Sequence, residues 1–387
     1  MKLIAKIVIG IVAGIIIGLV APLWLVRALD SVGYLLGQYI KFVIPLLVIA
    51  FLAKGVADFG KQAGRALTVG LGLAYISTVL AELLGFGVAS ILLPKLHIAN
   101  ATLATATKIV PLVQIDIPPI MNIMSALVFA LVLGLGITWI GKKTLGNALD
   151  EFSEIITRLV RKGVIPLFPF FVASVFMDVA AKGQLIPTAK AFFQVILMIL
   201  PTQWVWLGVL YLFASAISKH NAFPVLKTML PAYFTAMGTM SSAATLPVAL
   251  ECAHKVPSLR KEVVDFCMPL FNIAHLPGAA IAITMSAMTV AMLTKGGLPS
   301  LAAMLPFIII LGFIEVAAVG VPGGSVTAAL GILETVLLFD ATGLGLMVAL
   351  FMIQDSFGTA ANVVGDAALT VVVNQVIPPV ADVTVVA

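Results

Sequence analysis

Four polar side chains recur at helical spacing near the C-terminal end of the chain. Asp355, Thr359, Asn362 and Asp366 stand at positions i, i+4, i+7 and i+11 of an otherwise apolar stretch over 344–373. This spacing places all four on one face of a helix. Two acids at membrane depth are costly unless they meet a cation, a partner or water. The stripe therefore predicts a binding site.

The composition predicts an all-α protein that crosses a membrane several times. Of the 387 residues, 61% are hydrophobic and 10% are charged, and the mean hydropathy is +1.18. A soluble domain is about 25% charged. The formal charge of +5 is explained by positively charged loops on one side of the membrane, so no nucleic-acid partner is expected.

Enzyme chemistry is not expected from the cysteine and histidine content. The two cysteines, Cys252 and Cys267, have neither disulfide nor zinc spacing, and the four histidines are scattered. No pairing of a nucleophile with a base is visible, and we expect no organic cofactor.

Eight apolar runs are long enough to span a bilayer, and two further runs are interrupted by Gly, Pro and Ser. The eight are 4–23, 32–56, 67–93, 120–140, 155–176, 192–217, 264–292 and 344–373. The first is expected to be a transmembrane helix, since no A-x-A cleavage site follows it. The interrupted runs, 224–249 and 301–338, are predicted to be re-entrant helical hairpins.

Lys and Arg positions give the orientation. With the N-terminus in the cytoplasm and both hairpins returning to their own side, 15 of the 22 Lys and Arg residues fall on the cytoplasmic side. This bias predicts a multi-pass protein whose N- and C-termini are both cytoplasmic.

Each interrupted run contains a predicted turn. In 238–247, Ser241 and Ser242 lie among small residues that would let a hairpin tip present backbone N–H groups to an anion; the alternative is a kinked helix packed through small residues. In 320–325, Gly323 follows a proline, which favours a turn; the alternative is an ordinary loop.

A helix break is predicted between the two hairpins, at Pro277 and Gly278. His275 stands beside the break and is interpreted either as a proton carrier or as a histidine satisfied by a neighbouring helix. Glu82, an acid in the third run, receives no role.

Two hairpin tips and a late polar helix together resemble the dicarboxylate/amino acid:cation symporter family, the glutamate transporter homologues. Ser-Ser-Ala-Ala-Thr-Leu-Pro (241–247) resembles the first hairpin of that family, and Gly-Val-Pro-Gly-Gly-Ser (320–325) resembles the second. The pattern over 355–366 resembles the last-helix signature. The resemblance covers nearly the whole chain in order, and its motifs are most similar to the bacterial sodium/serine-threonine symporter branch.

The resemblance implies an elevator transporter with two domains. Residues 1–65 and 119–185 would form a trimerising scaffold from runs 1, 2, 4 and 5. Residues 66–118 and 186–387 would form a transport domain that contains both hairpins. It also implies a homotrimer surrounded by lipid in a bacterial inner membrane.

The resemblance assigns Asp355 to the α-amino group of an amino-acid substrate. The remaining substrate contacts would be made by Ser241, Ser242, Gly323, Thr359 and Asn362. Relatives that carry acidic substrates have an arginine before the last-helix threonine or at the first tip, where this chain has Gly358 and Met240. Without an arginine a second carboxylate would lack its bidentate partner. Ala279 replaces a threonine that contacts the distal carboxylate in relatives. A small neutral amino acid such as serine, threonine or alanine is therefore expected.

Sodium is the expected coupling ion. The resemblance places one sodium site at Asp366 and Asn362, together with backbone oxygens near Asn272 and His275. A second site of the family is expected to be lost, because His275 and Pro277 replace its asparagine and aspartate, although Tyr75 and Thr78 still resemble its other ligands. His275 and Glu315 are possible proton carriers. Two alternatives stay open: a proton-coupled carrier of a mono- or dicarboxylate, and an anion-conducting relative.

Overall fold

Helices make up all the regular secondary structure in the part of the chain that the structure describes. The computed structural model describes residues 2–58, 65–96, 109–121, 123–141, 143–317 and 322–377. No strand occurs within these ranges, so the predicted all-α class is confirmed. The apolar runs form helices because a helix satisfies its backbone hydrogen bonds within one segment.

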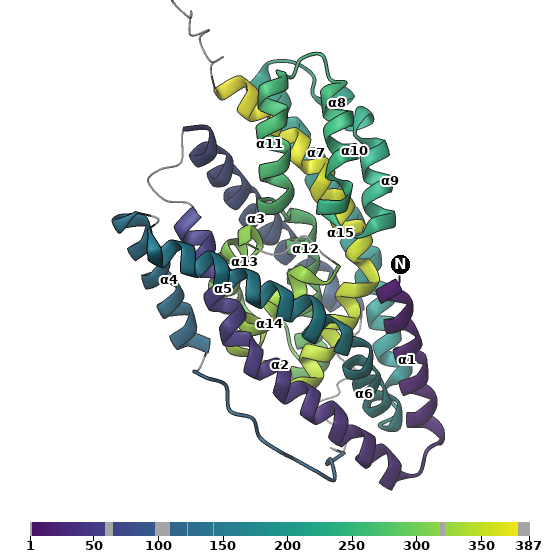
Figure 1. Cartoon of the computed structure of the whole chain (residues 1–387). Coiled ribbons are helices and arrows are strands. Elements are labelled where there is room, and N and C mark those ends of the chain that lie inside the picture. The colour runs from purple at the N-terminus through teal and green to yellow at the C-terminus, as the bar shows by residue number, and fades with distance from the viewer. Residues whose placement is uncertain are drawn as a thin grey trace, which may run out of the picture.

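Five helices from the N-terminal half pack mainly on one another (Figure 1). They are α1 (Lys2–Val20), α2 (Leu23–Asp58), α4 (Ile123–Ile140), α5 (Thr144–Leu159) and α6 (Phe168–Ala181). Helix α1 lies along α6, and α2 contacts α4, α6 and α5. A π-helical turn and a 3-10 turn join α5 to α6.

The contact between α1 and α6 is made through glycines. Gly10, Gly14 and Gly18 recur every four residues on α1, and a Cβ on any of them would collide with a backbone carbonyl of α6. The carbonyls belong to Pro169, Ala173 and Met177, respectively. Small residues at this spacing let two membrane helices approach backbone to backbone.

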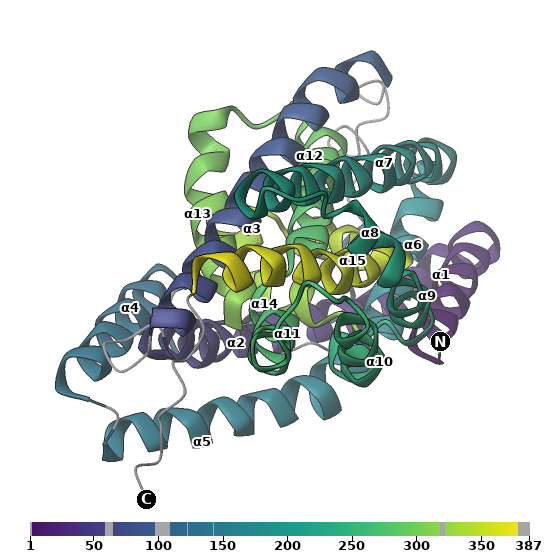
Figure 2. The same ribbon diagram turned by 90° about the horizontal axis from the view of Figure 1, so that it is seen from above.

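The remaining helices surround α15, which runs through the centre of the molecule (Figure 2). Helix α15 (Ala341–Val376) contacts α7 (Leu185–Ser218), α11 (Lys261–Ala274) and α12 (Pro277–Lys295). Helix α3 (Arg65–Leu92) packs on α12. Residues 358–373 of α15 are all buried, so this helix has protein on every side over that length.

Both interrupted runs form helix–turn–helix units, the predicted helical hairpins, and their re-entry into a membrane stays a prediction. The first consists of α8 (Phe223–Thr228), α9 (Leu230–Thr239) and α10 (Ser242–His254), and the second of α13 (Leu301–Ala317) and α14 (Gly324–Thr335). The first turn passes through Met240, whose φ is +52°, and the second through Gly323, whose φ is +73°. Gly320 and Val321 of the second predicted tip lie outside the described residues.

The predicted helix break is also confirmed. Helix α11 ends at Ala274 and α12 begins at Pro277. His275 is extended between them, with φ −125° and ψ 94°. Proline suits the first turn of α12 because its missing N–H would have had no partner there.

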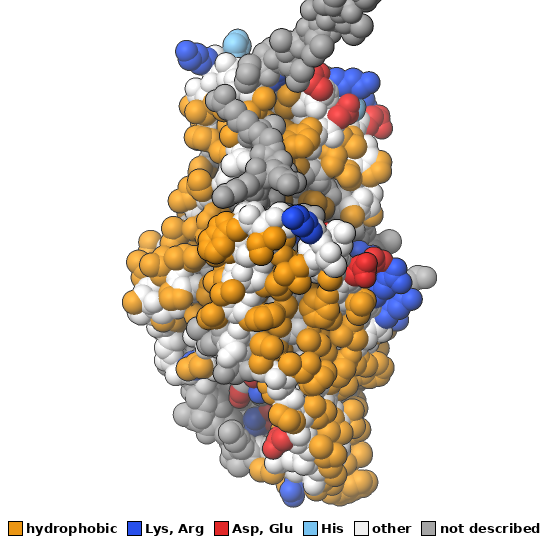
Figure 3. All heavy atoms as spheres, turned by 60° about the vertical axis from the view of Figure 1, so that its left-hand side comes forward, with side chains coloured by type: hydrophobic (Ala, Val, Ile, Leu, Met, Phe, Trp, Pro, Cys, Tyr) orange, Lys and Arg blue, Asp and Glu red, His pale blue; other side chains and the backbone are white. Residues whose placement is uncertain are grey.

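Helix length and hydropathy fit a membrane protein. Five helical stretches within the described ranges are long and apolar enough to cross a bilayer: Thr68–Leu96, Thr144–Ala181, Leu185–Ser218, Lys261–Lys295 and Ala341–Val376. The predicted count of eight spans stays a prediction, because α1 and α4 contain shorter apolar stretches. Hydrophobic side chains cover most of the face shown in Figure 3, and its charged side chains gather in a few clusters. Such a face suits contact with lipid.

Candidate functional site

The carboxylate of Asp355 joins α15 to the turn of the second hairpin. The backbone N–H of Gly323 donates to Asp355 Oδ2 at 2.9 Å, and the Thr359 hydroxyl donates to Oδ1 at 3.4 Å. Gly323 can place its N–H there because it adopts positive φ at the start of α14. Asp355 is 5% exposed, and no basic side chain among the described residues pairs with it. A cationic group is the partner that this carboxylate lacks.

Asn362 lies two turns further along α15 and caps the N-terminus of α12. Its Oδ1 accepts the N–H of Gly278 at 2.7 Å and the N–H of Ala279 at 3.4 Å. The first N–H groups of any helix have no partner within the helix. Asn362 therefore acts as an N-cap supplied by another helix, and it fixes the broken segment against α15.

Gly358 lies where α15 crosses the start of α12. A Cβ built on Gly358 would lie 3.4–3.5 Å from Gly278 and Ala279, while a Cβ on Gly278 would lie 2.5 Å from the Gly358 carbonyl oxygen. Ala279 is itself buried. Apart from the amides of Asn362 and Gln203, which bond to Gly278, the groups at this crossing are backbone and small apolar side chains.

A third group on α15 centres on Asp366. Asp366 Oδ1 and His275 Nδ1 are 3.0 Å apart, and His275 Nε2 is 2.8 Å from the hydroxyl of Ser77 on α3. His275 and Asp366 are fully buried. Both ring nitrogens of His275 are thus engaged, which agrees with the interpretation as a histidine satisfied by a neighbouring helix.

Among the groups around Asp366, one atom is suited to bind a sodium ion. Asp366 Oδ2 is buried without a hydrogen-bond partner within the described ranges, and a hard cation prefers such oxygen ligands. The imidazole of His275 offers only nitrogens, and both already have partners. The ring therefore orients Asp366, and the predicted sodium ligands near His275 stay the backbone oxygens of 272–275.

The tip of the first hairpin is held by its own serines and by Asn272 of α11. Ser241 caps α10 by accepting the N–H of Ala244 at 3.3 Å. Asn272 Nδ2 donates to the carbonyl oxygen of Ser242 at 3.0 Å. The predicted substrate residues of this tip and the predicted sodium ligand Asn272 therefore lie together, and α9 and α10 both pack on α15.

Glu315 joins the two helices of the second hairpin. The hydroxyl of Ser325, in the first turn of α14, donates to Glu315 Oε2 at 2.7 Å. Glu315 is fully buried, and its other carboxyl oxygen has no hydrogen-bond partner in the described part of the chain.

Three contributors were missed by sequence reasoning. Gln203 of α7 donates to the Gly278 carbonyl oxygen at 2.9 Å, Tyr211 donates to the Val364 carbonyl oxygen at 2.9 Å, and Ser77 contacts His275. Each is a polar side chain inside an apolar helical run, and this pattern can be seen in the sequence. The pattern does not identify the hydrogen-bond partner, because the partners are far away in the sequence.

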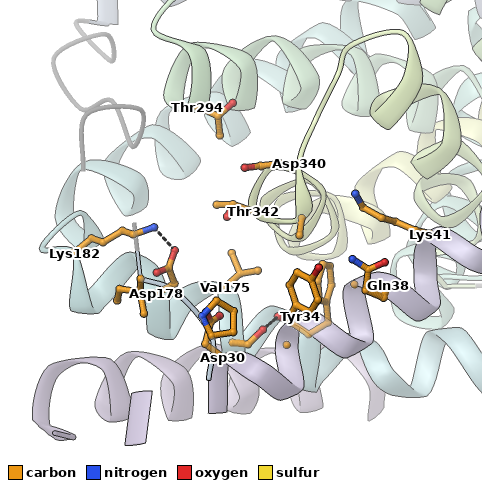
Figure 4. Close-up of a pocket in the computed structure, with 17 residues that line it drawn as sticks. Asp30, Tyr34, Gln38, Lys41, Val175, Asp178, Lys182, Thr294, Asp340 and Thr342 are labelled. Carbon is orange, nitrogen blue, oxygen red and sulfur yellow. Dashed lines mark hydrogen bonds and ion pairs between the residues drawn. The ribbon is translucent and has the colours of Figure 1, made fainter. Parts of the chain in front are cut away.

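A cavity of about 620 Å³ lies elsewhere, beside the start of α15 (Figure 4). Its walls come from α2 and α6 on one side and from the C-terminal end of α12 and the N-terminal end of α15 on the other. Asp178 and Lys182 form an ion pair in it. None of the predicted site residues lines it. The cavity is a polar cleft between two groups of helices, and the groups around Asp355 and Asp366 are packed separately from it.

Comparisons with known proteins point to one family. The model of the sodium:dicarboxylate symporter family matches residues 3–376. Neutral amino acid transporter A from Bos taurus and from Homo sapiens are each 28% identical over 253 residues, which is 64% of this chain and 47% of theirs. An excitatory amino acid transporter from Caenorhabditis elegans is 23% identical over 257 residues, 64% of this chain and 49% of its own. The matched region spans about half the length of these relatives.

Proposed function

The chain belongs to the sodium:dicarboxylate symporter family, and from that premise we propose that it takes up a small neutral amino acid together with sodium. Members of this family are membrane transporters and not enzymes. The observation that carries the choice of substrate is Asp355, a buried carboxylate at the hairpin turn without a basic partner among the described residues. The α-ammonium group of an amino acid supplies the missing charge.

The proposed neutral side chain follows from what surrounds that carboxylate. Gly358 and Ala279 are small and uncharged, and they lie against each other where α15 crosses α12. A second substrate carboxylate placed there would be buried without a cation, at a cost of several kcal/mol. Two relatives are neutral amino acid transporters by name, which supports the same choice. Serine, threonine and alanine are the proposed substrates.

Three groups are proposed to hold the substrate carboxylate: the tip at Ser241 and Ser242, Thr359, and Asn362. Ser241 and Ser242 begin α10, and the N-terminus of a helix attracts an anion. Thr359 stands one turn from Asp355 on the same face of α15. A zwitterion bound between the tip and α15 would therefore find complementary charge at both ends.

Sodium is the proposed coupling ion, held at Asp366 Oδ2. When bound, sodium supplies a positive charge that compensates the Asp366 carboxylate. His275 holds the other carboxyl oxygen, Oδ1, in place. Asn362 and Asp366 are one helical turn apart on α15, so the proposed amino-acid and sodium sites share that turn of the helix.

We also propose movement of one group of helices against the other, in a homotrimer of a bacterial inner membrane. Helices α1, α2, α4, α5 and α6 would be the scaffold, and α3 with α7 to α15 the transport domain. Their separate packing and the polar cleft between them support this division. The charge bias of the loops supports cytoplasmic termini. Native mass spectrometry in detergent would test the trimer.

A thermal-shift screen followed by uptake tests the function. Purified protein would be heated with single amino acids and organic acids, with sodium or potassium present. A ligand at 100 times its Kd stabilises by about 2.7 kcal/mol, so serine, threonine or alanine should raise the midpoint only when sodium is present. Proteoliposomes would then be given a sodium gradient or a pH gradient. Uptake driven by the pH gradient alone would refute sodium coupling, and stabilisation by dicarboxylates alone would refute the proposed substrate.

A further inference from the structure

Glu82 on α3 is the most isolated acid in the described part of the molecule. Its exposure is zero, and neither carboxyl oxygen has a hydrogen-bond partner within the described ranges. Glu315 on α13 acts on it electrostatically. Helix α3 packs against α12 and α13, so the two acids are buried on neighbouring helices.

No described basic side chain compensates these two acids. Tyr75 lies on α3 itself, and the helices packed against α3 carry these buried titratable groups: Glu315 on α13, Cys267 on α11, His275 at the junction of α11 and α12, Tyr211 on α7, and Asp355 and Asp366 on α15. His275 is engaged by Ser77 and Asp366. Two buried carboxylates with a single hydroxyl donor, at Glu315, and no cation would cost several kcal/mol. At least one of these two acids therefore binds a cation. The smallest such cation is the proton.

The hydrogen bonds distinguish the two acids. Glu315 accepts the Ser325 hydroxyl and lies beside the N-terminus of α14, where the helix dipole favours a negative charge. Glu82 has neither form of support. Glu315 is therefore the carboxylate of the pair, and Glu82 is the protonated acid.

We propose that Glu82 and Glu315 form a proton site whose proton is released when an amino acid binds at Asp355. The coupling is electrostatic. Asp355 accepts the Gly323 N–H and Glu315 accepts the Ser325 hydroxyl at the same hairpin turn, so their negative charges repel each other and favour the protonated pair. An ammonium group on Asp355 brings one positive charge into this buried region, and that charge takes the place of the proton, which leaves Glu82 for water. This coupling rests on the proposed function, whereas the protonation of Glu82 does not.

Two measurements test the proposal, with Glu154→Gln, an exposed acid on α5 paired with Arg158, as the matched control. The first is the infrared spectrum of the substrate-free protein. The C=O stretch of a protonated carboxylic acid should be present in the wild type and in Glu154→Gln, and weaker in Glu82→Gln. An unchanged band in Glu82→Gln overturns the proton site, even if no amino acid binds.

The second measurement is the dissociation constant of serine in sodium at several pH values. Release of one proton makes binding up to tenfold tighter for each pH unit, and Glu82→Gln should remove this dependence while still binding serine. Glu82→Asp keeps the acid and should restore it. The same pH dependence in Glu82→Gln, or tighter binding at lower pH, overturns the coupling. If serine does not bind to the wild type at any pH, the proposed function fails and the infrared result still decides the proton site.

Discussion

Replacing Gly278 with alanine should force α12 away from α15 and damage the proposed amino-acid site. The new Cβ would lie 2.5 Å from the Gly358 carbonyl oxygen, 2.9 Å from Ala361 Cβ and 3.0 Å from Asn362 Oδ1. Carbon atoms in contact are normally about 3.5–4.0 Å apart. All three neighbours belong to α15, and both helices are buried here, so the crossing has to widen.

The size of the effect follows from two costs. Overpacking a well-packed interior costs about 1–3 kcal/mol. Moving α12 also stretches the 2.7 Å bond from the Gly278 N–H to Asn362, and a buried donor without its partner costs about 1–3 kcal/mol more. The free energy of unfolding should therefore fall by about 2–6 kcal/mol, and substrate affinity should fall at least tenfold because Asn362 is displaced.

The assay is thermal unfolding in detergent together with amino-acid binding in sodium. Gly208→Ala on α7 is the matched control, because a Cβ there meets no atom within 4 Å. The control should be neutral or stabilised by up to about 1 kcal/mol through helix propensity. If Gly278→Ala unfolds and binds like the control, the tight crossing of α12 and α15 is wrong.

Three further substitutions test other parts of the molecule. Asp355→Asn can still accept the Gly323 N–H, so the midpoint of unfolding should stay close to wild type while the Kd for serine rises by about two to three orders of magnitude, the cost of an unpaired buried charge; unchanged binding would exclude the α-amino assignment. His275→Ala leaves Asp366 and a serine hydroxyl without partners and should lower stability by about 2–6 kcal/mol; a midpoint equal to wild type would contradict the buried hydrogen bonds. Arg260→Ala removes donors to the last carbonyls of α15 and should cost about 1–3 kcal/mol, visible as faster hydrogen exchange in its last turns; unchanged exchange there would argue against this anchor.

The sequence predicted most of the elements because they depend on local chemistry. Pro277 followed by Gly278 ends one helix and begins another, and the structure breaks there. Proline alone was not sufficient: Pro45 and Pro201 lie inside α2 and α7, which continue past them. Both hairpins were predictable because small and turn-forming residues interrupt an apolar run, a pattern that a continuous span does not need.

The partners of the polar residues could not be read from the sequence. The stripe on α15 was visible from its spacing, but Asp366 meets a histidine 91 residues away, and that histidine meets a serine another 198 residues away. A serine inside an apolar helix gives no indication of such a partner. Spacing determines which face of a helix carries a residue, whereas its partner depends on which helix packs against that face.

The glycines between α1 and α6 restrict how the molecule can move. Because Gly10, Gly14 and Gly18 each face a backbone carbonyl of α6, sliding α1 by a single residue would drive side chains into those carbonyls. A shift of four residues, about 6 Å, would still bring Lys6 or Pro22 in place of one glycine. The contact between α1 and α6 therefore resists sliding of one helix along the other. Smooth displacement of one part of the molecule past another is left to surfaces lined by side chains, and the cleft of Figure 4 is such a surface.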